Sequence, residues 1–441
     1  MPPRYSNSSA ETTKKENARK TRAQSASEIA RNVKSFETWA TYQGCEEVEY
    51  NDLPAHLAVE VKNVFDVSGR LPDAWLDKSS RVHKALKKLV SAEFMEFIRS
   101  AHDASPELFT SAMSEPECRN LLCDIQSVFV AWTRLQKMRN SSRKWSEADY
   151  TANVYNVFRS PAARESDYRA QCSVSLSQPL SCFAVTSKAV RALNAKAACP
   201  DSSFFIPTRL IRELSHSARS PFKLLKAHPS VVNSGSVGGE SSFRFQSTPC
   251  TKLPDTPGFE FASTFWEDKK PVHHMLDDAY RQNRMATTSA VRQLHSLHVQ
   301  APIFGLVWAR GTVRAHVDWW TVKPNSDYPS IQSAAYPGAN YGGRRTSDIF
   351  HEWQLDEPSD ILQVYLLVRN MDHWTVNGFC ERVISGIKQL ATDVVENEHA
   401  FVPWKRKGDL GRSIPTNIPR NPVPAATPSP PRRKPGGRAR R

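Results

Sequence analysis

A glutamate and a lysine, two positions apart, close an apolar run near the middle of this chain. The run Phe259–Lys270 reads FEFASTFWEDKK, and its apolar residues recur at every second position before Glu267 and Lys269. Because side chains alternate between the two faces of a strand, this spacing predicts a strand with Glu267 and Lys269 side by side on its apolar face. A carboxylate and an ammonium on such a face are costly unless they pair or bind a metal ion. The pattern is also typical of a strand whose charged end reaches solvent, so other residues must decide between the two interpretations.

Hydrolysis of a phosphodiester is a reaction that such a pair could serve. It needs a hard metal ion, which neutralises charge on the scissile phosphate and generates a hydroxide nucleophile. Mg²⁺ or Mn²⁺ takes oxygen ligands, so two or three carboxylates from different elements are required. A nearby lysine can orient or deprotonate water and stabilise the developing charge. Glu267 and Lys269 supply part of this set, and a further carboxylate must come from another segment.

Two aspartates that follow a proline are candidates for the further carboxylate. Asp255 lies twelve residues before Glu267 and stands among turn residues, which puts it up to roughly 40 Å away in an extended chain. Asp201 begins a short β run that Pro207 closes. If this run pairs antiparallel with the strand of Glu267, the two side chains lie about 5 Å apart. We therefore prefer Asp201, although some fifty residues separate the two runs where a short hairpin loop would be usual.

The reading frame of the charged pair has an alternative. Asp268 and Lys270 have the same spacing as Glu267 and Lys269. We prefer Glu267 and Lys269 because their face also carries the phenylalanines and so points toward the covering helices.

The surrounding pattern predicts the elements that position these residues. A helix is expected to begin at 145–149, and another is expected over 272–297, directly after the charged run. Residues 301–308 and 312–322 form an expected hairpin, in whose second arm Arg314, His316 and Asp318 alternate with apolar residues, as is typical of a polar strand face. Helical spacing predominates over 28–139. The sequence thus predicts a mixed α/β fold: a central sheet flanked by helices and preceded by an all-helical N-terminal region.

The positive charge is confined to the two ends of the chain. The formal net charge is +14, of which 405–441 contribute +10 and 1–27 contribute +4, so the body is neutral overall. We expect a disordered basic arm at 1–27, a helical region at 28–139, the α/β domain at 140–398 and a disordered Pro/Arg-rich tail at 403–441. Basic arms of this kind bind nucleic acid or act as nuclear-import signals.

The cysteines and the apolar runs bear on the compartment. The eight cysteines include no Cys-x-x-Cys pair, and neither a signal-peptide core nor an apolar run of 18 residues occurs. We expect reduced thiols and an intracellular, nuclear protein. No phosphate-binding GxxxxGK loop and no GxSxG motif occurs, which argues against an NTPase and a serine hydrolase.

The two charged motifs, around Asp201 and around Glu267, resemble those of a known family. Pro200-Asp201 followed by Glu267-Asp268-Lys269 resembles the motif of the PD-(D/E)xK nuclease superfamily, which has the restriction-endonuclease-like fold. The run WEDKKP at 266–271 and the run AYRQ at 279–282 are similar to uncharacterised fungal PD-(D/E)xK nuclease-like proteins, and the resemblance covers roughly 145–390.

The resemblance implies a role for each candidate residue. Asp201 and Glu267 would be metal ligands, and Lys269 would be the catalytic lysine. Glu147 resembles an additional acid that some members use, here as a further metal ligand. Gln282 resembles a polar residue on the helix after the motif, which supports the site or contacts substrate.

Two functions from different classes follow from these patterns. The first is an Mg²⁺- or Mn²⁺-dependent nuclease that hydrolyses phosphodiester bonds, with DNA expected in preference to RNA. The second is a catalytically inactive module of the same fold that binds nucleic acid or protein. The presence of all five candidate side chains favours the enzyme.

Overall fold

The computed structural model describes most of the chain before residue 397. The described residues are 22–180, 184–232, 236–237, 240–241, 243–269, 275–309, 311–324, 326, 328–337, 350–396, 401, 403 and 410. The described residues from 22 to 410 belong to one compact unit. The expected arm up to residue 21 and the expected C-terminal tail, except for Pro403 and Leu410, lie outside the described residues.

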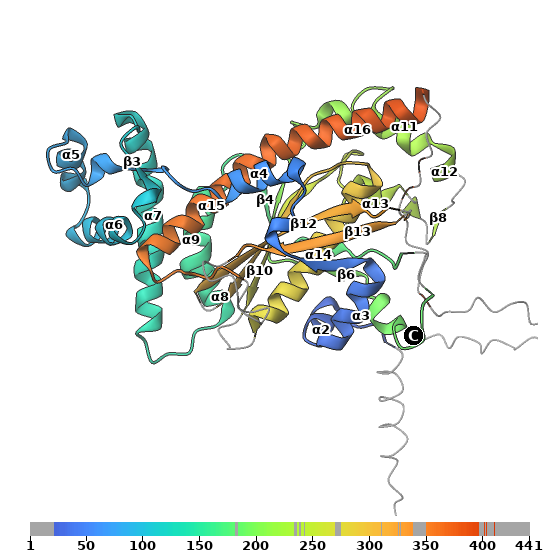
Figure 1. Ribbon diagram of the computed structural model, residues 1–441, viewed down its shortest axis with the longest axis horizontal. Coiled ribbons are helices and arrows are strands. Elements are labelled where there is room, and N and C mark those ends of the chain that lie inside the picture. Colours follow the sequence, from blue (N-terminus) through green and yellow to red (C-terminus); the bar gives the residue numbers. More distant parts are fainter. Residues whose placement is uncertain are drawn as a thin grey trace, which may run out of the picture. The chain divides into compact units, whose positions relative to one another are not determined.

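A mixed eight-stranded sheet forms the centre of this unit (Figure 1). Its neighbours in space are, in order, β1 (Cys45–Val48), β13 (Pro329–Ala335), β12 (Thr312–Val322), β11 (Ile303–Ala309), β10 (Ala262–Lys269), β7 (Ser202–Phe205) and β4 (Asp167–Ala170), with β14 (Trp353–Gln354) paired to β12. The pairs β10/β11 and β1/β13 are parallel, and the other neighbours are antiparallel. The predicted hairpin is β11/β12, and the predicted mixed α/β architecture is confirmed.

Short strand pairs and many helices surround this sheet. The strand pairs are β2 (Leu71–Pro72) with β3 (Phe109–Thr110), β5 (Val174–Ser175) with β6 (Ala197–Ala198), and β8 (Ser236–Val237) with β9 (Glu240–Ser241). The helices before β4 are α2 (Ala26–Ala30), α3 (Val33–Gln43), α4 (Ala55–Phe65), α5 (Arg81–Leu89), α6 (Ala92–Ala104), α7 (Glu115–Arg139), α8 (Glu147–Tyr150) and α9 (Asn156–Ala162). The later helices are α10 (Val190–Leu193), α11 (Pro221–Ala227), α12 (Pro229–Val232), α13 (Arg244–Ser247), α14 (Met275–Ser296), α15 (Pro358–Val376) and α16 (Gly378–Glu396).

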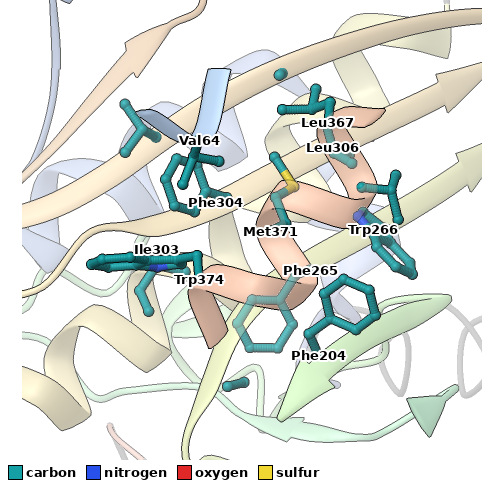
Figure 2. Packing of buried hydrophobic residues seen from close by; sticks show 14 of the residues in the cluster. Val64, Phe204, Phe265, Trp266, Ile303, Phe304, Leu306, Leu367, Met371 and Trp374 are labelled. Atoms are coloured by element: carbon teal, nitrogen blue, oxygen red, sulfur yellow. The ribbon is translucent and has the colours of Figure 1, made fainter. Parts of the chain in front are cut away.

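Helices cover both faces of the central strands. On one face, α14 packs along β10 and β11, where Val307 contacts Ala279 and Tyr280 in a small apolar cluster. On the other face lie α9 and α15. Figure 2 shows Trp374 of α15 beside Phe304, and their ring centroids are 6.5 Å apart. The central strands are therefore buried on both sides, which explains why even their polar side chains are shielded from water.

The N-terminal region departs from the all-helical prediction. It is mainly helical, but it also contains β2 and β3, and it supplies β1 to the edge of the central sheet, parallel to β13. The four residues of β1, CEEV, are too few and too polar to show the two-residue period of a strand. The segment is extended because it pairs with β13. The α4 and α7 helices also pack on α15. The expected boundary at residue 139 therefore does not separate two compact units.

The expected N-terminal arm also ends earlier than predicted. The α2 helix begins at Ala26, with Ser25 and Glu28 forming a reciprocal capping box. The backbone N–H of Gln24 donates a hydrogen bond to Arg191 O at 3.0 Å. Residues 22–27, which the sequence assigns to a disordered arm, thus belong to the folded unit.

The long connection between β7 and β10 folds on itself before it returns to the sheet. It contains α11, α12 and α13. Phe222 of α11 packs its ring against Phe259, with centroids 5.1 Å apart, directly before β10. Phe222 and Phe259 are part of the main hydrophobic core, so the connection packs on the folded unit before the chain returns to the sheet.

None of the helices among the described residues combines the length and the apolar character needed to cross a bilayer.

Candidate active site

The pairing of β7 with β10 brings two of the predicted carboxylates together. The strands are antiparallel, with Ser202 opposite Trp266. Asp201 directly precedes this pair and Glu267 directly follows it, so the two residues are neighbours at the ends of adjacent strands. The backbone N–H of Asp201 donates to Trp266 O at 2.9 Å, and the Oδ2 of Asp201 accepts from the backbone N–H of Asp268 at 2.7 Å. The predicted antiparallel pairing is confirmed.

Glu267 is held in the interior with one oxygen free. Its side chain is 2% exposed, and its Oε1 accepts from Lys269 Nζ in an ion pair. Its Oε2 has no hydrogen-bond partner among the described residues. Burial raises the pKa of Glu267 well above its ordinary value, Lys269 opposes this rise, and the charge of Asp201 adds to it. A buried carboxylate oxygen without a partner, next to a second carboxylate, is the arrangement that a cation would stabilise.

Lys269 lies between β10 and α14, next to Glu267. Its ammonium contacts Glu267 and also lies 3.2 Å from Oε1 of Gln282, a buried side chain on α14. The Lys269 side chain is 17% exposed. The predicted group of Glu267, Lys269 and Gln282 is thus brought together, with the ammonium at the boundary between the interior and the solvent.

The strand alternates less regularly than the sequence predicts. The register between β10 and β7 shifts between Ala262 and Thr264, which is the mark of a β-bulge. Ser263 hydrogen-bonds Thr375 of α15 at 2.6 Å. The expectation that Phe259, Phe261 and Ser263 share the face of Phe265, Glu267 and Lys269 is therefore wrong before the shift, because an extra residue in a strand reverses the direction of the side chains that precede it.

Asp201 is less deeply buried than Glu267, and its acidity is also perturbed. Burial raises the pKa of Asp201 to about 6, and the charges of Asp268 and Glu147 add to this rise. The backbone N–H of Asp268 and the ammonium of Lys269 oppose it. Glu147 is the first residue of α8, half-buried, and it lies within electrostatic range of Asp201.

The raised pKa of Asp201 has a consequence for stability. Folding disfavours the charged carboxylate, so the folded protein binds more protons than the unfolded chain between pH 4 and 6, and its stability falls as the pH rises through this window. Asp201→Asn keeps an oxygen that can accept from Asp268 but carries no charge. The difference in unfolding free energy between Asp201→Asn and the wild type should therefore grow in favour of the variant as the pH rises. We expect this growth to be on the order of 2 kcal/mol from pH 4 to pH 8.

Urea unfolding in chelator-treated buffer at several pH values measures this difference. Asp255→Asn is the matched control, because Asp255 is exposed. A difference between Asp201→Asn and wild type that is constant from pH 4 to pH 8 would contradict the raised pKa.

Asp268 serves a different purpose from its two neighbours on β10. It points toward α9, where Arg159 binds it with both nitrogens of the guanidinium: Nη2 to Oδ1 at 2.7 Å and Nη1 to Oδ2 at 3.0 Å. Both side chains are buried. The guanidinium also lies 3.8 Å from the ring centroid of Trp308. Asp268 is therefore held in an interior ion pair with Arg159, and Glu267 is the carboxylate that pairs with Lys269. Lys270 lies outside the described residues.

A buried polar network anchors α14 beside Gln282. His316 Nδ1 lies 3.0 Å from Oδ1 of Asp318, and its Nε2 lies 2.9 Å from Oδ1 of Asn283 on α14. Because the Asn283 amide nitrogen donates to Phe265 O at 3.0 Å, its oxygen is left to accept from His316. Gly305 makes room for this network, since an added Cβ would lie 1.9 Å from His316 Nε2.

This network corrects one expectation from the sequence. His316 and Asp318 were expected on a polar strand face, but both are fully buried between the sheet and α14. Alternation shows only that these residues share a face, and the covering helix decides that this face is interior. Neither the network nor the Arg159–Asp268 pair was predicted, and a buried ion pair leaves no signal in residue spacing.

The described residues contain no group of three or more His, Cys, Asp and Glu side chains placed to hold a metal ion. The candidate donor set is therefore the pair Asp201 and Glu267, with Glu147 farther out. Comparison of the chain with protein-family models and with curated proteins finds no match.

Proposed function

We propose that this protein is a metal-dependent nuclease that hydrolyses phosphodiester bonds of nucleic acid, with DNA preferred over RNA. One observation carries the proposal: β7 and β10 place Asp201 beside Glu267, whose buried Oε2 has no hydrogen-bond partner among the described residues. Burial raises the pKa of both carboxyl groups, and the ammonium of Lys269 offsets this rise only in part. Perturbed acids of this kind cluster at functional sites.

The donor atoms fit a hard divalent cation. Mg²⁺ is commonly held by one or two carboxylates together with water and substrate phosphate oxygens. Asp201 and Glu267 would provide the carboxylates, and Glu147 would add charge from α8. When bound, such an ion neutralises the scissile phosphate and lowers the pKa of a water molecule.

Lys269 and Gln282 have defined tasks in this proposal. Gln282 Oε1 and Glu267 Oε1 both accept from the ammonium of Lys269, which holds it at the edge of the site. From there, Lys269 can donate to a phosphate oxygen or orient the attacking water. Gln282 is a positioning residue in this arrangement because its contact is with Lys269.

The order of elements supports membership of the PD-(D/E)xK superfamily. Glu147 lies on α8, which precedes β4 and β7 in the chain; Asp201 directly precedes β7, Glu267 lies near the end of β10, and Gln282 lies on α14, the helix after the motif. This is the order that the sequence resemblance implies. The restriction-endonuclease-like fold is part of the same proposal.

The distribution of charge supports nucleic acid as the substrate. The segment 405–441 carries eleven Lys and Arg residues against one acid. Contacts between such a segment and phosphates release counterions and contribute affinity that is independent of sequence. We propose that the basic segments bind the backbone and direct the protein to the nucleus, while the folded unit carries the chemistry.

Cleavage assays test the proposed function. The full chain is incubated with supercoiled plasmid, linear duplex, single-stranded DNA or RNA, in Mg²⁺, in Mn²⁺ and in chelator. Metal-dependent cleavage that is lost in Glu267→Gln supports a nuclease. Binding without cleavage of any substrate by the wild type would favour the inactive binding module instead.

Metal binding is also expected to stabilise the protein. A ligand that binds only the folded state adds about 2.7 kcal/mol at one hundred times its dissociation constant, so Mg²⁺ or Mn²⁺ should raise the thermal midpoint of the wild type. Glu267→Gln should abolish the rise, because a neutral amide is a poor ligand for a hard ion. The rise should shrink below pH 6, where protons compete for Asp201.

Thermal unfolding with a titrated metal measures this effect. Asp255→Asn serves as the control and should respond to metal like the wild type. A metal-induced rise that survives in Glu267→Gln but disappears in Asp255→Asn would place the site elsewhere.

A further inference from the structure

Two cysteines lie across a short antiparallel contact that involves Val174. Val174 and Cys250 form an antiparallel bridge, and the backbone N–H of Thr251 donates to Ser173 O at 2.7 Å. Since side chains alternate along an extended segment, Cys172 lies on the same face as Val174, diagonally opposite Cys250. Both residues line the same cavity.

A cavity gives small molecules access to this pair. Both cysteines line it, together with Arg169 and Glu260, and its volume is about 650 Å³. Cys172 is half-buried and Cys250 is buried. Both are free thiols. The cavity therefore exposes Cys172 more than its partner.

The surroundings make the two thiols chemically unequal. The neighbouring Cys250 thiol lowers the pKa of Cys172 to about 7, burial and the charge of Glu260 oppose this, and the positive charge of Arg169 favours it. The neighbouring Cys172, together with burial and the charge of Glu260, raises the pKa of Cys250. Arg169 is held in place by Glu260, with Nη1 and Oε1 2.7 Å apart. Cys172 is thus the nucleophile, and Cys250 keeps its proton.

We propose that Cys172 and Cys250 form a peroxide-reactive thiol pair that closes to an intramolecular disulfide. The Cys172 thiolate attacks one oxygen of hydrogen peroxide, the O–O bond breaks, and the departing hydroxide is protonated to water. Sulfur is thereby oxidised to a sulfenic acid, and the peroxide is reduced. Cys250 then attacks this sulfur, the S–S bond forms, and the hydroxyl group leaves with the Cys250 proton as a second water.

Peptide mass spectrometry tests this proposal on the full reduced chain. After brief exposure to hydrogen peroxide at pH 7 and blocking of the remaining thiols, we expect one disulfide that joins the peptides of Cys172 and Cys250. In Cys250→Ser the reaction should stop at a sulfenic acid on Cys172, which dimedone traps. A disulfide from Cys172 to Cys199 or to another cysteine, or equal oxidation of all cysteines, would overturn the proposal.

Cys123→Ser is the matched control. Cys123 is an exposed thiol on α7, and its replacement should leave the rate and the site of disulfide formation unchanged. A measurement on the unsubstituted protein guards against misfolding of a variant: the rate at which iodoacetamide alkylates Cys172 should rise about tenfold between pH 6 and pH 8 as the thiolate forms. A much steeper rise, approaching the roughly hundredfold change of a thiol with the ordinary pKa of about 8.5, would refute the assignment of Cys172 as the nucleophile. None of these readouts depends on phosphodiester hydrolysis.

Discussion

Lys269→Ala is expected to lower the rate of nucleic-acid cleavage by roughly 10²–10⁴-fold, the usual contribution of a positioned proton-transfer group. The ammonium is held between Glu267 and Gln282 and reaches the boundary of the site, where water and a phosphate would meet it. Alanine removes the ammonium, which is the member of the Glu267–Lys269 ion pair that can donate a hydrogen bond to the reacting oxygens. It leaves both carboxylates in place, so the metal-induced rise in the thermal midpoint should persist.

Single-turnover cleavage at saturating metal, together with thermal unfolding, measures the two effects separately. Lys323→Ala is the matched control, because Lys323 is exposed and pairs with Glu46. Lys323 directly follows the last residue of β12, whereas Lys269 lies at the edge of the sheet where β12 begins. Its cleavage rate should equal that of the wild type. Wild-type cleavage by Lys269→Ala would remove Lys269 from the chemistry, and loss of metal stabilisation in this variant would show that the lysine has a structural role in the site.

Arg159→Met is expected to destabilise the protein by about 3–5 kcal/mol, the usual cost of leaving one member of a buried ion pair alone. The Asp268 side chain is 2% exposed and Arg159 is 0% exposed, so water cannot replace the lost partner. Within the described part of the chain, the Thr151 hydroxyl at 3.3 Å is the side-chain hydrogen bond that Asp268 retains. The substitution also removes the contact between the Arg159 guanidinium and the ring of Trp308.

The double replacement Arg159→Met/Asp268→Leu separates charge from packing. Replacing a buried ion pair by apolar side chains is often nearly neutral, so the double variant should be more stable than Arg159→Met alone. Urea unfolding of the wild type and both variants measures this. Arg119→Met, which removes an exposed pair with Glu115 on α7, should change the unfolding free energy by about 1 kcal/mol or less. A double variant less stable than Arg159→Met would refute the argument from charge.

Local spacing alone predicted several of the elements that carry the site. The alternation before Glu267 predicted β10, although the strand begins at Ala262 and a bulge follows. The helical period after it predicted α14, and Pro200 with the apolar run up to Pro207 predicted β7. Periodicity reveals these elements because it reflects the geometry of one segment and needs no partner.

The tertiary structure alone decided which side chains meet. Glu267 and Asp268 have equally spaced lysines, and only the packing of Arg159 on α9 assigns Asp268 to an interior ion pair. Asp201 and Glu267 are 66 positions apart, and their contact depends on the antiparallel pairing of β10 with β7 across a long connection. Such contacts arise from the closure of long loops and from packing between faces, and neither leaves a trace in the period of a single segment.

Burial was decided in the same way. The alternation over Arg314, His316 and Asp318 indicated a shared face, and α14 with Asn283 turned this face into the interior. The strand β1 is likewise a strand because β13 offers it an edge. The sequence therefore determined the identity and order of the candidate groups, whereas the fold determined their environment, because desolvation and pairing depend on residues that are remote in the chain.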